Sequence, residues 1–119
     1  MGAAAPDLRG VAQIGFHAQQ AIEKLLKALL TAFGVQPEDQ HSLGRLIEQV
    51  GRLDRQTADR VGDVSSLTRY AVYHRYPPRV PGGAQPLTRR DVLQDLARAR
   101  SAVPVLLTAI EARLAASRD

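Results

Sequence analysis

The stretch VAQIGFHAQQAIEKLLKALLTAF, residues 11–33, decides the fold of this chain. Apolar residues recur in it at steps of three and four, which is the period of an α-helix with one buried face. Gly34 supplies a residue suited to a left-handed helix end, and Pro37 cannot continue a helix. The stretch therefore predicts a long amphipathic helix of roughly 25 residues. We expect its polar face to carry Gln19, Gln20, Glu23, Lys24 and Lys27, with an ion pair between Glu23 and Lys27.

The segments that follow also have helical patterns. Ser42 is a candidate N-cap for a short helix that ends near Gly51. Asp54 or Thr57 starts a third helix, expected to run through Gly62 until Pro77 stops it. Thr88 and Asp91 have the spacing of a capping box, and the last helix contains Pro104, which should kink or split it.

The composition supports helices packed on helices. Hydrophobic residues make up 45% of the 119 residues but aromatic residues only 4%, so the core must be aliphatic. No strand pattern or internal repeat is visible. We therefore predict an all-α fold, an antiparallel up-and-down bundle of about four helices. Residues 1–8 are expected to be a disordered lead and residues 9–119 a single domain.

Composition also limits the chemistry and the location. The chain has no Cys, which excludes disulfides, thiolate catalysis and Cys-ligated zinc. No apolar run is long enough to cross a membrane, and the first residues lack the order of a signal peptide, so we expect a cytoplasmic protein. We expect no cofactor and no metal, since Asp59 and Asp63 are better explained as a solvated face than as ligands.

The balance of charges is basic. Lys and Arg total 16 against 12 Asp and Glu, with a formal charge of +4, and all the bases except Lys24 and Lys27 are Arg. Arginine forks suit phosphate oxygens, so the excess is compatible with binding of RNA or a nucleotide. An Arg-rich coding bias explains it equally well.

The stretch LTRYAVYHRYPP, residues 67–78, is where we look for function. Arg69 can hold a phosphate, and His74 can act as general acid or base near neutral pH. Five residues apart on a helix, they are rotated by about 140°, so a cleft shared by two subunits would be needed to bring them together. The alternative is a solvated Arg69 and a His74 that caps the helix C-terminus. Tyr70 and Tyr73 suit either base stacking or, as we favour, packing at an interface.

Three pieces of the sequence together resemble the HEPN domain family. They are the FHAQQAIEKLLKALL helix at residues 16–30, His41-Ser42-Leu43, and Arg75-Tyr76-Pro77. Members of that family are small helical bundles, commonly homodimers, and many act in a toxin–antitoxin pair with a minimal nucleotidyltransferase. The resemblance covers residues 11–107. Family members usually have a full helix before this stretch, and here only residues 7–14 are available for it, so we expect either a much reduced first helix or a truncated version of the domain.

The resemblance also implies roles for individual residues. Arg69 and His74 match the family's metal-independent RNA-cleaving motif, and Tyr76 matches a tyrosine that the partner adenylylates in some members. Tyr73 and Arg75 are candidate contacts to RNA or nucleotide. One departure is Tyr70, where active toxins commonly have Asn after the motif Arg. The alternatives are a non-catalytic dimeric module that binds a nucleotide or the nucleotidyltransferase, and a purely structural helical adaptor.

Overall fold

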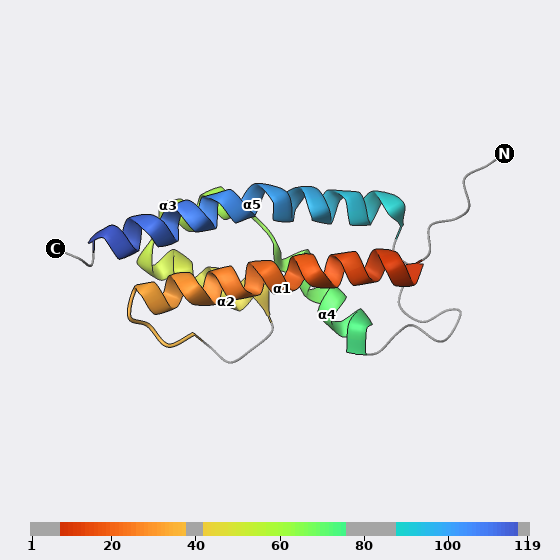
Figure 1. The fold of residues 1–119 in the computed structure, drawn as a ribbon, viewed down its shortest axis with the longest axis horizontal. Helices are drawn as coiled ribbons and strands as arrows, with labels where there is room; N and C mark the ends of the chain where they lie inside the picture. Colours follow the sequence, from red (N-terminus) through yellow and green to blue (C-terminus); the bar gives the residue numbers. More distant parts are fainter. Residues whose placement is uncertain (1–7, 38–41, 76–87, 117–119) are drawn as a thin grey trace.

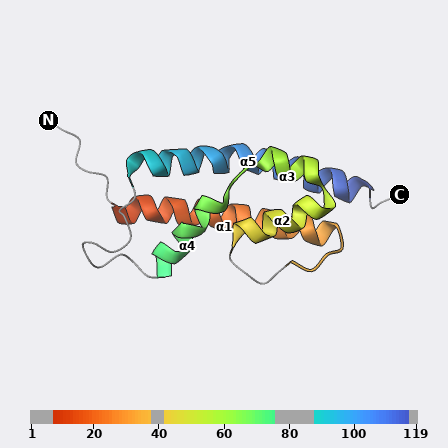
Figure 2. The same ribbon diagram turned by 180° about the vertical axis from the view of Figure 1, so that it is seen from behind.

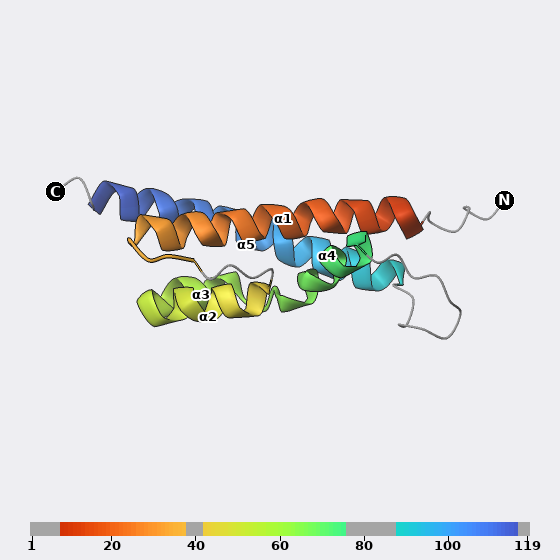
Figure 3. The same ribbon diagram turned by 90° about the horizontal axis from the view of Figure 1, so that it is seen from below.

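The computed structural model describes residues 8–37, 42–75 and 88–116, and its five α-helices confirm the predicted all-α bundle. They are α1 (Leu8–Ala32), α2 (Leu43–Leu53), α3 (Arg55–Val61), α4 (Thr68–Arg75) and α5 (Arg89–Ala116), with a 3-10 turn, η1 (Ser65–Leu67), before α4. Helices α1 and α5 lie side by side and run in the same direction, as does α2, whereas α3 and α4 run the opposite way (Figures 1 and 2). The shorter helices pack against the α1–α5 pair, with α2 and α4 on α1 and α3 on α5 (Figure 3).

The long helix α1 ends where the sequence predicts. Gly34 has a φ of 79°, and its N–H donates to the Thr31 carbonyl at 2.9 Å. The Val35 N–H donates to the Leu30 carbonyl, also at 2.9 Å, which completes a Schellman cap. Residues 8–14, expected to be the remnant of a shortened first helix, form the first turns of α1 itself.

The predicted third helix is divided into two helices, α3 and α4, in the structure. The third helix was expected to continue from Asp54 or Thr57 to the residues before Pro77, but α3 ends at Val61. Gly62 follows with φ 75° and ψ −164°, a conformation that essentially only glycine adopts, so the chain leaves the helix there. Asp63 then accepts hydrogen bonds from the Ser65 N–H and hydroxyl, at 3.0 and 2.5 Å, and starts the η1 turn. The bundle consequently has five α-helices in its described part where about four were expected.

The remaining caps largely follow the prediction. The Asp54 carboxylate caps α3 by accepting from the Thr57 N–H at 3.1 Å. Thr88 and Asp91 form the predicted capping box of α5, with bonds of 3.0 and 3.2 Å. Ser42 is the N-cap residue of α2, but its side chain makes no cap bond, and the Leu43 N–H donates instead to the Thr68 hydroxyl at 3.2 Å. Pro104 lies inside α5 and does not split it.

Among the described residues, the fully buried hydrophobic side chains are aliphatic apart from Tyr70. The largest fully buried hydrophobic side chains are Tyr70, Ile22, Leu26, Leu29, Leu30, Leu43, Leu46, Leu67, Leu106, Val50 and Val64. Across the part of the chain that is described, none of the helices is long and apolar enough to cross a membrane.

Part of the predicted polar face of α1 is buried. Gln19 and Glu23 are 0% and 5% exposed, because they share the inward stripe of α1 with Gly15 and Leu26. Gln19 donates to Glu23 at 3.0 Å, so two polar groups in the interior satisfy each other. The predicted pair of Glu23 with Lys27 is confirmed at 3.4 Å.

Candidate functional site

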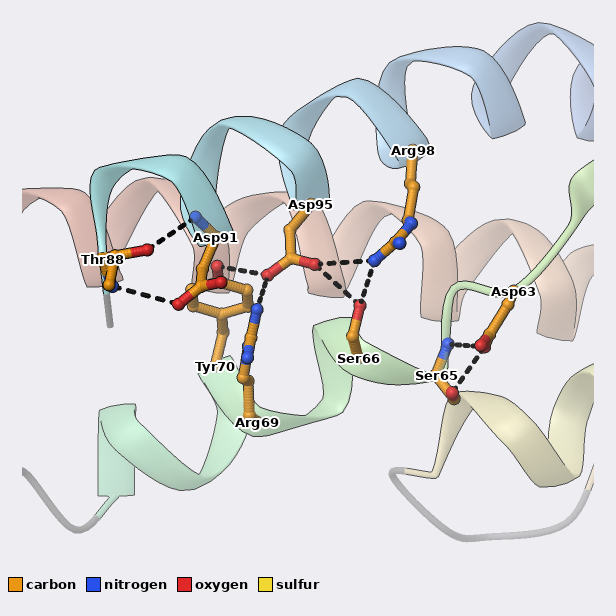
Figure 4. Close-up of polar contacts among 9 residues, drawn as sticks. All are labelled: Asp63, Ser65, Ser66, Arg69, Tyr70, Thr88, Asp91, Asp95 and Arg98. Atoms are coloured by element: carbon orange, nitrogen blue, oxygen red, sulfur yellow. Dashed lines mark hydrogen bonds and ion pairs between the residues drawn. The ribbon is translucent and has the colours of Figure 1, made fainter. Parts of the chain in front are cut away.

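A buried carboxylate, that of Asp95, is the centre of the main polar cluster between α4 and α5. Asp95 occupies the inward stripe of α5 between Val92 and Ala99, and it is 1% exposed. The Tyr70 hydroxyl donates to its Oδ2 at 2.6 Å, and the Ser66 hydroxyl donates to its Oδ1 at 2.7 Å. Figure 4 shows these side chains converging on Asp95 from η1 and α4. A carboxylate removed from water in this way needs such donors to remain charged.

Two arginines reach the same carboxylate from different helices. Arg69 on α4 donates from Nη2 to Oδ2 of Asp95. Arg98 on α5 lies with Nη1 3.4 Å from Oδ1 of Asp95 and 3.3 Å from the Ser66 hydroxyl. Both guanidinium side chains stay partly in solvent, at 36% exposure for Arg69 and 50% for Arg98. The cluster therefore has a buried negative centre and a positive outer edge (Figure 4).

These contacts shift the ionisation of the buried groups. Burial alone would raise the pKa of Asp95, but the hydrogen bonds from Tyr70, Arg69 and Ser66 outweigh it and hold that pKa below its ordinary value. Burial raises the pKa of Tyr70, and its bond to the Asp95 carboxylate adds to the rise. At neutral pH the cluster thus contains an ionised Asp95, a neutral Tyr70 and a charged Arg69.

Tyr70 connects the cluster to the core. Its ring lies against Gly15 of α1, while its hydroxyl bonds to Asp95 of α5. The side chain is 0% exposed, which excludes base stacking by Tyr70, and its packing is not the packing at an interface that we favoured. Packing here is within the core of one chain.

One predicted site residue, Arg69, has a described side chain, and it belongs to this cluster. Arg69 is held at Asp95, next to Tyr70. His74, Tyr73 and Arg75 belong to α4, but their side chains lie outside the described residues. Tyr76 lies outside the described residues altogether. Because α4 is helical through Arg75, the backbone positions of Arg69 and His74 are rotated by about 140°, and the requirement for two subunits stays a prediction.

Among the described residues, no group of metal-ligand side chains accompanies the cluster. Within residues 8–37, 42–75 and 88–116, no three His, Cys, Asp or Glu side chains gather as metal ligands. Asp63, which the sequence places one helical turn after Asp59, accepts the two hydrogen bonds from Ser65 that start η1. The chemistry available in the described cluster is therefore that of arginine and hydroxyl donors around one carboxylate.

A separate groove lies toward the other end of α5. It has a volume of about 550 Å³ and is lined by Phe33, Arg60, Thr108 and Arg113 among others. The Arg113 guanidinium lies 4.7 Å from the centre of the Phe33 ring. None of the predicted site residues lines this groove.

Comparison with known proteins identifies the family. The family model of the HEPN domain matches residues 10–106. The chain belongs to the HEPN family. No curated protein and no solved structure matched it in the two other comparisons. The matched region includes Arg69, His74 and Asp95, so the polar cluster is part of the HEPN domain itself.

Asp95 is the residue that sequence reasoning missed. A signal for it was present, because Val92, Asp95, Ala99, Ala102 and Leu106 follow one another at steps of three and four. A charged residue on such a stripe is either buried with partners or marks the edge of the apolar face. The sequence does not say which partners it takes, since Ser66 and Arg69 are 29 and 26 residues away.

Proposed function

We propose that this HEPN protein is the RNA- or nucleotide-binding component of a toxin–antitoxin pair with a minimal nucleotidyltransferase, and that it cleaves RNA without a metal. Family membership supports RNA as the ligand, since HEPN domains commonly bind RNA and form dimers. The observation that carries the proposal is the position of Arg69, whose guanidinium is fixed by Asp95 yet keeps 36% of the side chain exposed.

In the proposed reaction, Arg69 and His74 act on one phosphodiester. His74 accepts the proton of the 2′-hydroxyl as the 2′-oxygen bonds to phosphorus and the P–O5′ bond breaks, and water gives the departing 5′-oxygen its proton. With His74 as the acid instead, it protonates the 5′-oxygen and water takes the proton of the 2′-hydroxyl. Arg69 stabilises the charge that develops on the phosphate oxygens. Because Arg69 and His74 lie on different sides of α4, a second copy of the chain completes the site. Tyr73 and Arg75 would contact the RNA or nucleotide, and Tyr76 is the proposed target of adenylylation by the partner.

The test is cleavage of a labelled RNA in EDTA by the parent protein, by His74→Ala and by His17→Ala. His17 is an exposed histidine on α1, so it is a matched control for loss of an imidazole. We expect cleavage by the parent and by His17→Ala and none by His74→Ala. Equal cleavage by all three proteins would reject His74 as the acid or base.

A non-catalytic binding module is the second candidate, and one observation favours it. Arg69 already has an ion-pair partner, Asp95, within its own chain, as an arginine with a structural role would. This candidate predicts RNA or nucleotide binding without cleavage by the folded dimer. In that case His74→Ala would change neither RNA integrity nor toxicity in cells.

A further inference from the structure

Two arginines from different helices share one buried carboxylate. Arg69 bonds to Oδ2 of Asp95, and Arg98 approaches Oδ1. The Ser66 hydroxyl lies between them, donating to Oδ1 and accepting from Arg98 at 3.3 Å. Because the two guanidinium groups contact the two oxygens of a single carboxylate, they are held on either side of that carboxylate at the α4–α5 junction (Figure 4).

This arrangement leaves donors available for an anion. A guanidinium carries five N–H donors, and Asp95 takes one nitrogen from each arginine. The contacts of Arg98 are long, 3.3 and 3.4 Å, and half of its side chain is in solvent. Phosphate oxygens are the acceptors that such paired forks suit best. A side chain already held in place also loses less freedom when it binds.

Charged groups of both signs lie around the pair. Residues 89–100 of α5 contain four arginines (Arg89, Arg90, Arg98 and Arg100) and two aspartates, and Arg100 points about 200° away from Arg98 around the helix. Of the aspartates, Asp95 is buried, and Asp91 accepts a hydrogen bond from the Thr88 N–H at the start of α5. Asp91 lies close enough to Arg69, and Asp63 close enough to Arg98, for the arginine to contribute to the lowered pKa of each carboxyl, after the hydrogen bonds from Thr88 and Ser65. The pair therefore offers an anion its unused N–H donors and not a uniformly positive surface.

We propose that Arg69 and Arg98 together bind a backbone phosphate of single-stranded RNA and that Asp95 is the positioning residue for both. This inference rests on the RNA-binding half of the proposed function and is independent of cleavage. It adds Arg98 as a binding residue and gives Asp95 a role beyond joining α4 to α5.

Binding of a fluorescein-labelled, 2′-O-methylated oligonucleotide, followed by anisotropy across a range of salt concentrations, tests the proposal without cleavage of the ligand. One lost phosphate contact lowers the slope of log affinity against log salt by about 0.7 for a single strand. We expect that change for Arg98→Ala, with affinity about fivefold weaker at 0.1 M salt on the same relation. Arg98→Lys, which keeps the charge, should keep most of the slope.

Arg100→Ala is the matched control, because Arg100 is an exposed arginine of α5 that lies about 200° around the helix from Arg98. It should leave the slope unchanged. Asp95→Asn gives the sharpest contrast. It removes a negative charge and would strengthen binding if charge alone mattered, whereas loss of positioning weakens it. Should Asp95→Asn fail to fold, the comparison of Arg98→Ala with Arg100→Ala decides the question.

The outcomes separate this inference from the cleavage proposal. A lower salt slope for Arg98→Ala than for the parent, with no RNA cleavage by the parent, would support the phosphate site and reject the ribonuclease. RNA cleavage that depends on His74, with the same salt slope for Arg98→Ala and the parent, would support the ribonuclease and reject the phosphate site. A parent protein that binds no oligonucleotide overturns the phosphate site.

Discussion

Gly15 of α1 and the ring of Tyr70 on α4 are in direct contact, with no space for a side chain between them. A Cβ at position 15 would lie 2.2 Å from Cδ1 and 2.3 Å from Cε1 of Tyr70. The hydroxyl at the far end of the same ring bonds to Asp95 of α5. One side chain therefore fixes three helices relative to one another, and Arg69 is its neighbour in the sequence.

Replacement of Gly15 by Ala should destabilise the protein. Alanine favours a helix over glycine by about 1 kcal/mol, but overpacking of a core costs about 1–3 kcal/mol or more. The ring cannot move away freely because it is buried and bonded to Asp95. We expect a net loss of about 2 kcal/mol in the free energy of unfolding, measured in urea. Gly51→Ala is the control, because its nearest neighbours lie 3.5 Å away, and it should be neutral or stabilising. Equal effects at both positions would contradict the contact.

Loss of the Tyr70 hydroxyl should also weaken the fold. Tyr70→Phe keeps the ring against Gly15 but removes a 2.6 Å hydrogen bond to the charged Asp95. Hydrogen bonds to charged groups contribute about 1.5–3 kcal/mol, and we expect a loss in that range. The raised pKa of Tyr70 adds a test at alkaline pH. A tyrosine with a raised folded-state pKa contributes stability that is complete below pH ~10 and declines above it.

The parent should therefore lose stability above pH ~10 more steeply than Tyr70→Phe does. Urea unfolding at several pH values between neutral and alkaline checks this. If the free energy of unfolding falls equally steeply with pH for the parent and for Tyr70→Phe, Tyr70 ionises as easily in the folded chain as in the unfolded one.

The sequence predicted those features that depend on neighbours along the chain. The left-handed helix end at Gly34 and the Thr88–Asp91 capping box are local, and both are confirmed. Of the two candidate starts of the third helix, Asp54 is the N-cap. The burial of Gln19 and the role of Asp95 depend on distant helices, so no local pattern could supply their partners. His74 and Tyr76 were proposed from the resemblance, and they stay predictions.

The helix end at Gly62 has a local cause, but the sequence pattern did not predict it, and it gives a third prediction. A lone glycine in a helical pattern normally weakens a helix slightly, but here its φ of 75° and ψ of −164° end α3. Any other residue in that conformation costs about 1–3 kcal/mol. Gly62→Ala should lower the free energy of unfolding by that amount, although no atom lies within 4 Å of the added Cβ. If the variant is instead as stable as the parent, α3 and α4 can be joined as one helix, as the sequence pattern suggested.

Asp95→Asn should change both stability and its dependence on pH. Removal of one member of a buried ion pair costs about 3–5 kcal/mol, and asparagine, which keeps an acceptor for Tyr70 and Ser66, should lie near the lower value. The folded-state pKa of Asp95 is depressed, so its contribution is complete above the unfolded value of about 3.9 and is lost as the pH falls through the folded value. The parent should therefore lose its advantage in stability over Asp95→Asn below pH ~4, where the stability curves of the two proteins converge.

Asp59→Asn is the control, because Asp59 is an exposed residue on α3, and its stability should stay within about 0.5 kcal/mol of the parent throughout. Curves for Asp95→Asn and the parent that remain equally far apart down to pH ~2 would mean that the carboxylate is not held in its charged form by Arg69, Tyr70 and Ser66.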